Sequence, residues 1–264
     1  MSRMLWRGRA ESWDAEGSVA TGPVADAVLA RCGERPGVAV DLGCGSGQLT
    51  LPLAERCERV LAVDIDPGAI GILADRARRA GAGNLQTLTE PLERLDLEAG
   101  SVDLVVSNYA LHHLRDADKR LLLERALVWL SPGGRIVIGD MMLGRGARAD
   151  DRRVIADKVR GLARRGPGGW WRIAKNVVRF LLRFQERPLR PEAWARLLRA
   201  AGFVGIGAER VVSEAWVVWA TRPRAPQGQA VPAPASCAAE VIVATPGAPP
   251  AATRARSAPA RPWR

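Results

Sequence analysis

Several residue types on which particular protein classes depend are scarce in this 264-residue sequence. Its four cysteines form no C-x-x-C pair, and its only histidines, His112 and His113, are adjacent in the chain. A disulfide scaffold and a zinc module are therefore disfavoured, and no metal site is expected. The first ten residues lack the apolar core of a signal peptide, and no apolar run approaches the roughly 18 residues of a membrane-spanning helix. We therefore expect a cytoplasmic protein.

Lysine is also scarce, since only three of the 39 basic residues are lysines, while the formal net charge is +11. This charge is unevenly distributed along the chain. Residues 145–199 carry a net charge of +11, whereas residues 1–144 carry −4. Residues 223–264 carry +4. Because a basic surface attracts nucleic acids and anionic membranes, any such attraction is expected from residues 145–199 and 223–264 rather than from the whole chain.

The body of the chain alternates apolar, strand-like runs with helix-like segments, which indicates a parallel α/β sheet. Strands are expected at residues 38–41, 59–64, 85–88, 102–107 and 135–141, and helices at 48–56, 67–80, 118–130 and 191–201. Two more strands, at 203–212 and 215–221, are joined closely enough to be antiparallel neighbours. Residues 223–264 are rich in alanine and proline, so we expect a disordered tail.

The strongest motif, Val40-Asp-Leu-Gly-Cys-Gly-Ser-Gly47, lies where the first expected strand turns into a helix. Its glycines allow the backbone to approach a ligand closely, and a helix N-terminus offers free N–H groups. The dinucleotide pattern G-x-G-x-x-G fails because its last position is Gln48 or Thr50. Asp64 ends the second strand 21 residues after Gly43, where a carboxylate can accept both hydroxyls of a ribose. The motif thus predicts a nucleoside ligand.

Four features in this order resemble class I S-adenosylmethionine-dependent methyltransferases, in particular the small-molecule and ubiquinone/menaquinone-biosynthesis group. They are the glycine motif, Asp64, Ser101–Leu114 (SVDLVVSNYALHHL) and Leu130-Ser-Pro-Gly-Gly134. The resemblance implies a doubly wound, Rossmann-like α/β sheet of about seven strands with the last strand antiparallel. It implies a methyltransferase domain at residues 22–222, an N-terminal cap segment at 1–21, and a basic helical lid insertion at 143–190 after the fifth strand.

The resemblance also implies a binding site for S-adenosyl-L-methionine at the carboxyl ends of the first strands. The implied cofactor-binding residues are Asp41, Gly43, Gly45, Gly47, Asp64, Ile65, Glu90 and Asn108. By the resemblance, Asp41 and the glycines hold the methionine part and Asp64 holds the ribose. Ile65 lies against the adenine face, Glu90 accepts from the adenine amino group, and Asn108 lies near the sulfonium.

Methyl transfer requires that the acceptor lies close to the methyl group and in line with it. A base is required only if the acceptor is a hydroxyl or an acidic carbon. His112 or His113 is the candidate general base; the alternative is that the pair packs or caps the following helix. Tyr109 either lines the acceptor pocket or packs as an ordinary aromatic residue. The stretch Asn108-Tyr-Ala-Leu lacks the Asn/Asp-Pro-Pro-aromatic motif of enzymes that methylate nucleobase amino groups, which disfavours that substrate class.

The basic insertion contains a helical pattern from Trp170 to Arg187, with cations on one face and apolar side chains on the opposite face. Two interpretations stay open: a lid over the active site, or a peripheral contact with an anionic membrane at its inner face. A nucleic-acid partner is disfavoured because the aromatic residues are not interleaved with the cations.

The sequence therefore predicts an S-adenosylmethionine-dependent methyltransferase that acts on a small-molecule or lipid-like acceptor by O- or C-methylation. The alternatives are an RNA-directed methyltransferase and a module that binds S-adenosylmethionine without catalysis.

Overall fold

The computed structural model describes residues 22–143, 152, 156, 159–160 and 187–224. The expected cap segment at 1–21 and the expected tail beyond residue 224 lie outside the described residues. Most of the insertion at 143–190 also lies outside them, including the helical pattern from Trp170 up to residue 186.

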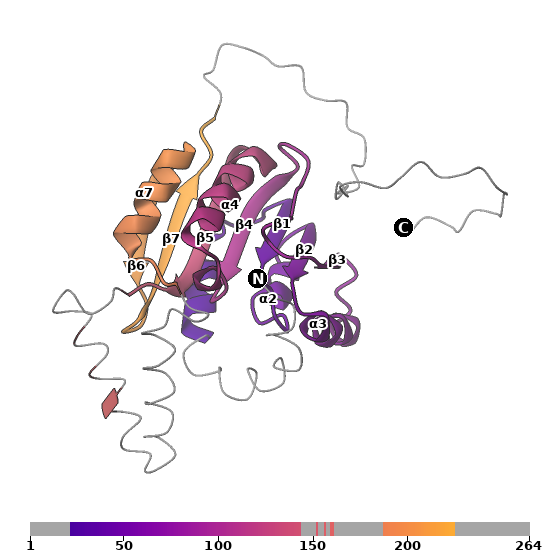
Figure 1. The fold of residues 1–264 in the computed structure, drawn as a ribbon. Coiled ribbons are helices and arrows are strands. Elements are labelled where there is room, and N and C mark those ends of the chain that lie inside the picture. The colour runs from indigo at the N-terminus through magenta and orange to yellow at the C-terminus, as the bar shows by residue number, and fades with distance from the viewer. Residues whose placement is uncertain (1–21, 144–151, 153–155, 157–158, 161–186, 225–264) are drawn as a thin grey trace, which may run out of the picture.

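The described residues form a seven-stranded sheet in the order β3-β2-β1-β4-β5-β7-β6 (Figure 1). Its strands are β1 (Val38–Leu42), β2 (Arg59–Asp64), β3 (Leu85–Thr89), β4 (Val102–Asn108), β5 (Leu130–Met141), β6 (Val204–Arg210) and β7 (Ala215–Thr221). Strands β1 to β5 are parallel to one another, and β7 is antiparallel to both β5 and β6. The expected sheet with an antiparallel last strand is therefore confirmed.

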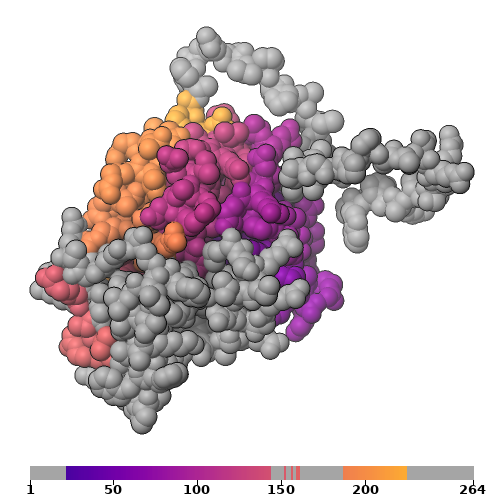
Figure 2. Space-filling view, in the orientation of Figure 1, coloured from indigo at the N-terminus to yellow at the C-terminus, as the bar shows by residue number. Residues whose placement is uncertain are grey.

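Helices cover both faces of the sheet. They are a helical segment at 22–31, α2 (Thr50–Ala54), α3 (Pro67–Ala80), the short 3-10 helix η2 (Leu111–His113), α4 (Asp116–Trp129) and α7 (Pro191–Ala201). Side chains of α4 and α7 pack with Val40 and Leu61 on one face, where these two helices lie side by side (Figure 1 and Figure 2). The 22–31 segment and α2 pack with Ala39 and Val60 on the other. Alternate residues of the buried strands thus face opposite helical layers.

Several expected boundaries differ from the structure by one or more residues, and two of these differences have a clear physical reason. The helix expected at 48–56 is limited to α2, because the glycine loop continues as turns up to Leu49 and Pro52 is tolerated only in a first helical turn. Strand β5 begins at Leu130 rather than Arg135, since Leu130 already pairs with Val102 before the register shifts.

The order of the strands places the candidate site. Strand β1 lies between β2 and β4, so the chain leaves β1 toward one side of the sheet and leaves β4 toward the other. In open α/β sheets, ligands bind outside the carboxyl ends of the strands at this reversal. A ligand site is therefore expected at the loops after β1, β2, β4 and β5.

Candidate functional site

The glycine loop after β1 contains two glycines that are closely packed and one that has free space beside it. Gly43 and Gly47 have φ values of +75° and +96°, and a Cβ atom at either would lie 2.3 Å from a side-chain carbon, of Ala110 and Leu73 respectively. Gly45 also has a positive φ of +53°, but a Cβ there would meet nothing within 4 Å. Packing therefore explains Gly43 and Gly47, whereas Gly45 borders space that a ligand can enter.

The carboxylate of Asp64 joins the end of β2 to this loop. Its Oδ2 accepts a hydrogen bond from the backbone N–H of Gly45 at 2.8 Å, and its Oδ1 accepts one from the N–H of Asp66 at 2.9 Å. Burial raises the pKa of Asp64, and these backbone hydrogen bonds oppose that rise. The structure thus brings the carboxylate of Asp64 to Gly45, in the loop where the sequence motif predicts a ligand.

Asp41, at the end of β1, is buried with one oxygen unpaired. Thr50 donates its hydroxyl to Oδ2 of Asp41 at 2.6 Å, whereas Oδ1 has no hydrogen-bond partner among the described residues. The residue is only 1% exposed, and burial raises its pKa to about 7, helped by the negative charge of Asp64. A buried carboxylate oxygen without a donor is costly, so this atom suits a cationic or N–H group of a ligand.

The other three expected cofactor residues follow β2, β3 and β4. Ile65 is half-buried directly after Asp64, and the N–H of Glu90 donates to the carbonyl of Asp64 at 3.0 Å. Asn108 ends β4, and its Oδ1 is a second buried acceptor without a partner in the described part of the chain. All eight expected cofactor residues therefore lie in segments that meet at one edge of the sheet.

His112, in η2, forms a close pair with Asp140 near the end of β5. The ring nitrogen Nδ1 lies 2.5 Å from Oδ1 of Asp140, and the backbone N–H of His112 donates to Oδ2 at 2.8 Å. The two residues are 5% and 1% exposed. The ring of His113 adjoins that of His112, with 3.9 Å between centroids. The structure thus gives one of the two candidate bases a carboxylate partner.

Tyr109 lies between Asn108 and η2 in a strained conformation. Its φ of 52° is the only positive value of a non-glycine residue in the described chain. Its N–H donates to the carbonyl of Gly139 at 2.8 Å, and its hydroxyl is buried with no partner among the described residues. Burial raises the pKa of this hydroxyl, with further contributions from Glu214 and Asp140. Backbone strain of this kind clusters at functional sites.

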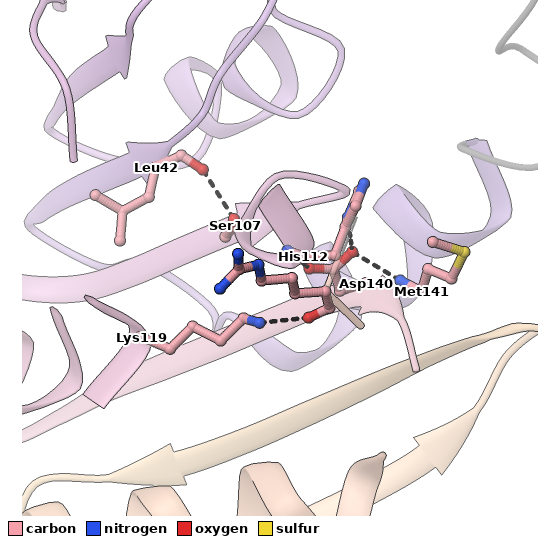
Figure 3. A network of polar contacts seen from close by, with 7 residues as sticks. Leu42, Ser107, His112, Lys119, Asp140 and Met141 are labelled. Carbon is pink, nitrogen blue, oxygen red and sulfur yellow. Dashed lines mark hydrogen bonds and ion pairs between the residues drawn. The ribbon is translucent and has the colours of Figure 1, made fainter. Parts of the chain in front are cut away.

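A buried lysine completes the network around η2 (Figure 3). Lys119 of α4 is 0% exposed, and its ammonium donates to the backbone carbonyl of Arg187 and to Oδ1 of Asp116. The N–H of Arg187 in turn donates to the carbonyl of His112 at 2.6 Å. The chain is therefore held against η2 at the point where it returns from the insertion.

Sequence reasoning missed Asp140, Lys119 and Thr50 as parts of this site. Of these three residues, only Asp140 could have been recognised from the sequence, because a charged residue near the end of a largely apolar strand is a common functional position. The lysine lies in a helix with other charged residues and Thr50 in a polar turn, so neither stands out in the sequence.

The family model described as "Methyltransferase domain" matches residues 39–134, which contain β1 to β4 and α4. The chain is 35% identical over 128 residues to a "Probable cobalt-precorrin-6B C(15)-methyltransferase (decarboxylating)" of Methanothermobacter thermautotrophicus, covering 46% of this chain and 64% of that protein. It is 32% identical over 116 residues to an uncharacterized methyltransferase of Geobacillus kaustophilus, covering 44% and 52%. The chain thus spans less than two thirds of either relative.

Among solved structures, the fold is similar to that of a Burkholderia thailandensis 1,6-didemethyltoxoflavin-N1-methyltransferase with bound 1,6-didemethyltoxoflavin and S-adenosylhomocysteine. The TM-score is 0.56 and the identity 24%, over 81% of this chain and 83% of that one. The sheet order, the glycine loop joined to Asp64 and the family match agree with one another. Residues 39–134 of the described domain therefore match a methyltransferase-domain family, and the domain has the fold of S-adenosylmethionine-dependent methyltransferases.

Proposed function

We propose that this protein transfers the methyl group of S-adenosylmethionine to a small-molecule or lipid-like acceptor by O- or C-methylation. The observation that carries the proposal is Oδ1 of Asp41, which has no hydrogen-bond partner among the described residues and is buried beside a glycine loop that is open at Gly45 and bonded to Asp64. A ligand donor for this atom is expected, because nearly all buried polar groups in folded proteins are hydrogen-bonded.

The residues at this edge fit S-adenosylmethionine group by group. The unpaired carboxylate oxygen of Asp41 suits the cationic amino group of the methionine part, and the open backbone at Gly45 allows close approach. Asp64 would accept from the ribose hydroxyls through the lone pairs that its two backbone donors leave available. Ile65 and Glu90 would flank the adenine, and Asn108 would lie near the sulfonium.

When bound, S-adenosylmethionine supplies a methyl group that is already electrophilic. The protein then has to exclude water, align the acceptor with that methyl group and remove a proton where the acceptor has one to lose. His112 and His113 are the candidates for the last task. Both belong to η2, which directly follows the loop carrying Asn108 and Tyr109.

Two similar proteins support a small acceptor. Their names describe methyltransferases acting on cobalt-precorrin-6B and on 1,6-didemethyltoxoflavin, at C(15) in the first and at N1 in the second. The acceptor of this chain and its acceptor atom remain part of the proposal. An RNA-directed methyltransferase and a binding module without catalysis are the competing functions.

The proposal is tested by incubating the full-length protein and isotopically labelled S-adenosylmethionine with cell extract, followed by mass spectrometry of lipid, small-molecule and RNA fractions. We expect label in the lipid or small-molecule fraction. Label in RNA would support the RNA-directed alternative. No label in any fraction, with cofactor binding intact by calorimetry, would support the non-catalytic module.

A peripheral contact with an anionic membrane through Trp170 to Arg187 stays a proposal from the sequence. In the part of the chain that the structure describes, no helix has both the length and the apolar character of a membrane span. Cosedimentation with vesicles of phosphatidylglycerol and phosphatidylcholine tests the peripheral contact. Salt-sensitive binding is expected from the cationic face, and its absence would contradict the proposal.

A further inference from the structure

The contacts of His112 differ from those of a histidine that merely fills space. Its backbone N–H and its ring Nδ1 both face Asp140, and its backbone carbonyl accepts from Arg187. None of the described residues hydrogen-bonds its remaining polar atom, Nε2. Figure 3 shows this outer ring nitrogen pointing away from Asp140. The surrounding structure therefore fixes the residue and leaves one nitrogen for another partner.

The contacts of Asp140 determine which nitrogen of His112 carries the proton. The Asp140 carboxylate is 1% exposed and accepts from the backbone N–H groups of His112 and Met141, at 2.8 and 2.7 Å. A buried carboxylate with converging donors is best matched by a third donor at Nδ1. In a neutral imidazole one nitrogen donates and the other accepts, so Nε2 is left with the lone pair.

We propose that His112 is the general base of the methyl transfer and that Asp140 is its positioning residue. We further infer that the acceptor atom carries an acidic proton, either an O–H or an activated C–H. This inference rests on the proposed function and deepens it. An amine needs no such base, because its lone pair attacks first and its proton leaves afterwards. A base held this firmly indicates an acceptor whose proton has to leave as the new bond forms.

The step balances with the groups named. Nε2 of His112 takes the acceptor's proton, the acceptor atom forms a bond to the methyl carbon, and the electron pair of the broken carbon–sulfur bond stays on sulfur. The positive charge of the sulfonium is thereby replaced by that of the imidazolium, which lies against Asp140 at Nδ1. The proton then passes to water when the product leaves. This arrangement resembles the role of the aspartate in a Ser-His-Asp triad, which orients the ring and stabilises its cation.

The proposal gives His112 and His113 different roles. The ring of His113 stacks at a tilt of 47° on that of His112, whereas the Asp140 carboxylate contacts His112. His113 can therefore shield one face of the neighbouring ring, and the proposal assigns it no proton transfer. The sequence alone left the choice between the two open.

A first test needs neither substrate nor turnover. Two-dimensional ¹H–¹⁵N spectra of the full-length wild type at about pH 8, where an ordinary histidine is neutral, report which ring nitrogen carries the proton. His112→Gln and His113→Gln assign the signals, since the chain has only these two histidines. We expect His112 to be protonated at Nδ1 and to lose this preference in Asp140→Asn. A His112 protonated at Nε2, or an unchanged signal in Asp140→Asn, would overturn the positioning role.

A second test measures labelled methyl transfer into extract at saturating cofactor. His112→Gln and Asp140→Asn should each lower the rate about 10²- to 10³-fold, as expected for loss of an oriented general base. His113→Gln should lose at least tenfold less. The ¹³C chemical shift of the transferred methyl group should identify oxygen or carbon as the acceptor atom. Label on an amine nitrogen, or a loss that follows His113, would contradict the inference.

Calorimetry with S-adenosylmethionine separates these failures from a failure of the proposed function. Binding should be retained in His112→Gln and Asp140→Asn, because neither residue is among the expected cofactor ligands. If wild type does not bind the cofactor, the proposed function fails. If wild type binds and transfers the methyl group while His112→Gln is as fast as wild type, only the assignment of the base fails.

Discussion

At the ends of β1 and β4, Asp41 and Asn108 bury oxygen atoms that have no partner among the described residues, whereas at η2 and the end of β5 His112 and Asp140 bond to each other. We call the first region, with the glycine loop and Asp64, the cofactor side. The second, with His112, Asp140, Lys119 and Arg187, is the acceptor side. The cofactor side carries an uncompensated carboxylate, while the acceptor side matches its carboxylate with donors.

This difference separates what folding completes from what a ligand completes. On the acceptor side, hydrogen bonds within the chain hold the proposed base in place before any ligand arrives, which is the kind of preorganisation that favours catalysis. On the cofactor side, the chain keeps binding groups at a cost to its own stability, and a ligand that satisfies them stabilises the folded state. The following predictions test this contrast.

The largest expected effect is a pair of isosteric substitutions with opposite signs. Without cofactor at about pH 8, Asp41→Asn should raise the free energy of unfolding by about 2–4 kcal/mol, because it removes a buried, poorly paired charge. Asp140→Asn should lower it by about 3 kcal/mol, because an amide cannot accept all three hydrogen bonds. Urea denaturation of both variants measures these changes. Changes of the same sign in the two variants would contradict the difference between the cofactor side and the acceptor side.

The glycine loop offers a second comparison. Gly43→Ala should lower the free energy of unfolding by about 2–3 kcal/mol, since a Cβ at φ +75° also overlaps the Cβ of Ala110. Gly45→Ala meets no atom within 4 Å, so it should cost only about 1 kcal/mol of backbone strain. For cofactor affinity measured on the folded fraction, the order of the two effects should reverse. Gly45→Ala should weaken binding more than Gly43→Ala, because Gly45 borders the open space. Similar stability losses in both variants would contradict this reading of the loop.

On the acceptor side, the buried lysine should matter more than its exposed neighbour. Lys119→Met removes the donor to the Arg187 carbonyl and should lower the free energy of unfolding by about 2 kcal/mol. Burial lowers the pKa of Lys119, so part of the lost hydrogen bonding is offset by relief from a desolvated charge.

Arg120→Met is the matched control on the same helix. Its exposed ion pair with Glu124, at 3.7 Å, should contribute less than about 0.5 kcal/mol. Equal losses in the two variants by urea denaturation would show that the Lys119 network adds no stability.

The smallest expected effect is the pH dependence of cofactor binding. The folded apoprotein holds Asp41 at a pKa of about 7, above its ordinary value. The unfolded chain therefore binds fewer protons between about pH 4 and 7, and the stability of the apoprotein falls as the pH rises through this window. A cationic ligand group needs the ionised form, so affinity should rise about tenfold from pH 6 to pH 8. Asp41→Asn should abolish most of this rise in calorimetric titrations.

How far the sequence predicts each side follows from the same contrast. The cofactor side depends on a contiguous motif and on Asp64, whose positions relative to strand ends can be read from local patterns. The doubly wound sheet of about seven strands, with its last strand antiparallel, follows from the alternation of elements and the resemblance. Glycine adopts the positive φ values found at 43, 45 and 47 more readily than any other residue, so the motif also indicates its own backbone geometry.

The acceptor side could not be predicted in the same way. His112 and Asp140 are 28 residues apart, and Lys119 reaches Arg187 across 68 residues. Only the parallel pairing of β4 with β5 brings Asp140 to η2, and side-chain pairs of this kind leave no local pattern. The sequence therefore indicated two candidate bases, and the contact of His112 with Asp140 is the basis on which we propose one of them.

The central claim is that the edge formed by Asp41, the glycine loop and Asp64 binds S-adenosylmethionine, and calorimetric titration tests it most directly. Wild type should bind one equivalent, and Asp64→Ala should bind at least about 100-fold more weakly after losing charge-assisted hydrogen bonds to the ribose. Asp75→Ala on α3, an exposed carboxylate paired with Arg78, is the matched control and should bind as wild type does. Absence of binding by wild type, or equal affinity in Asp64→Ala, would contradict the account.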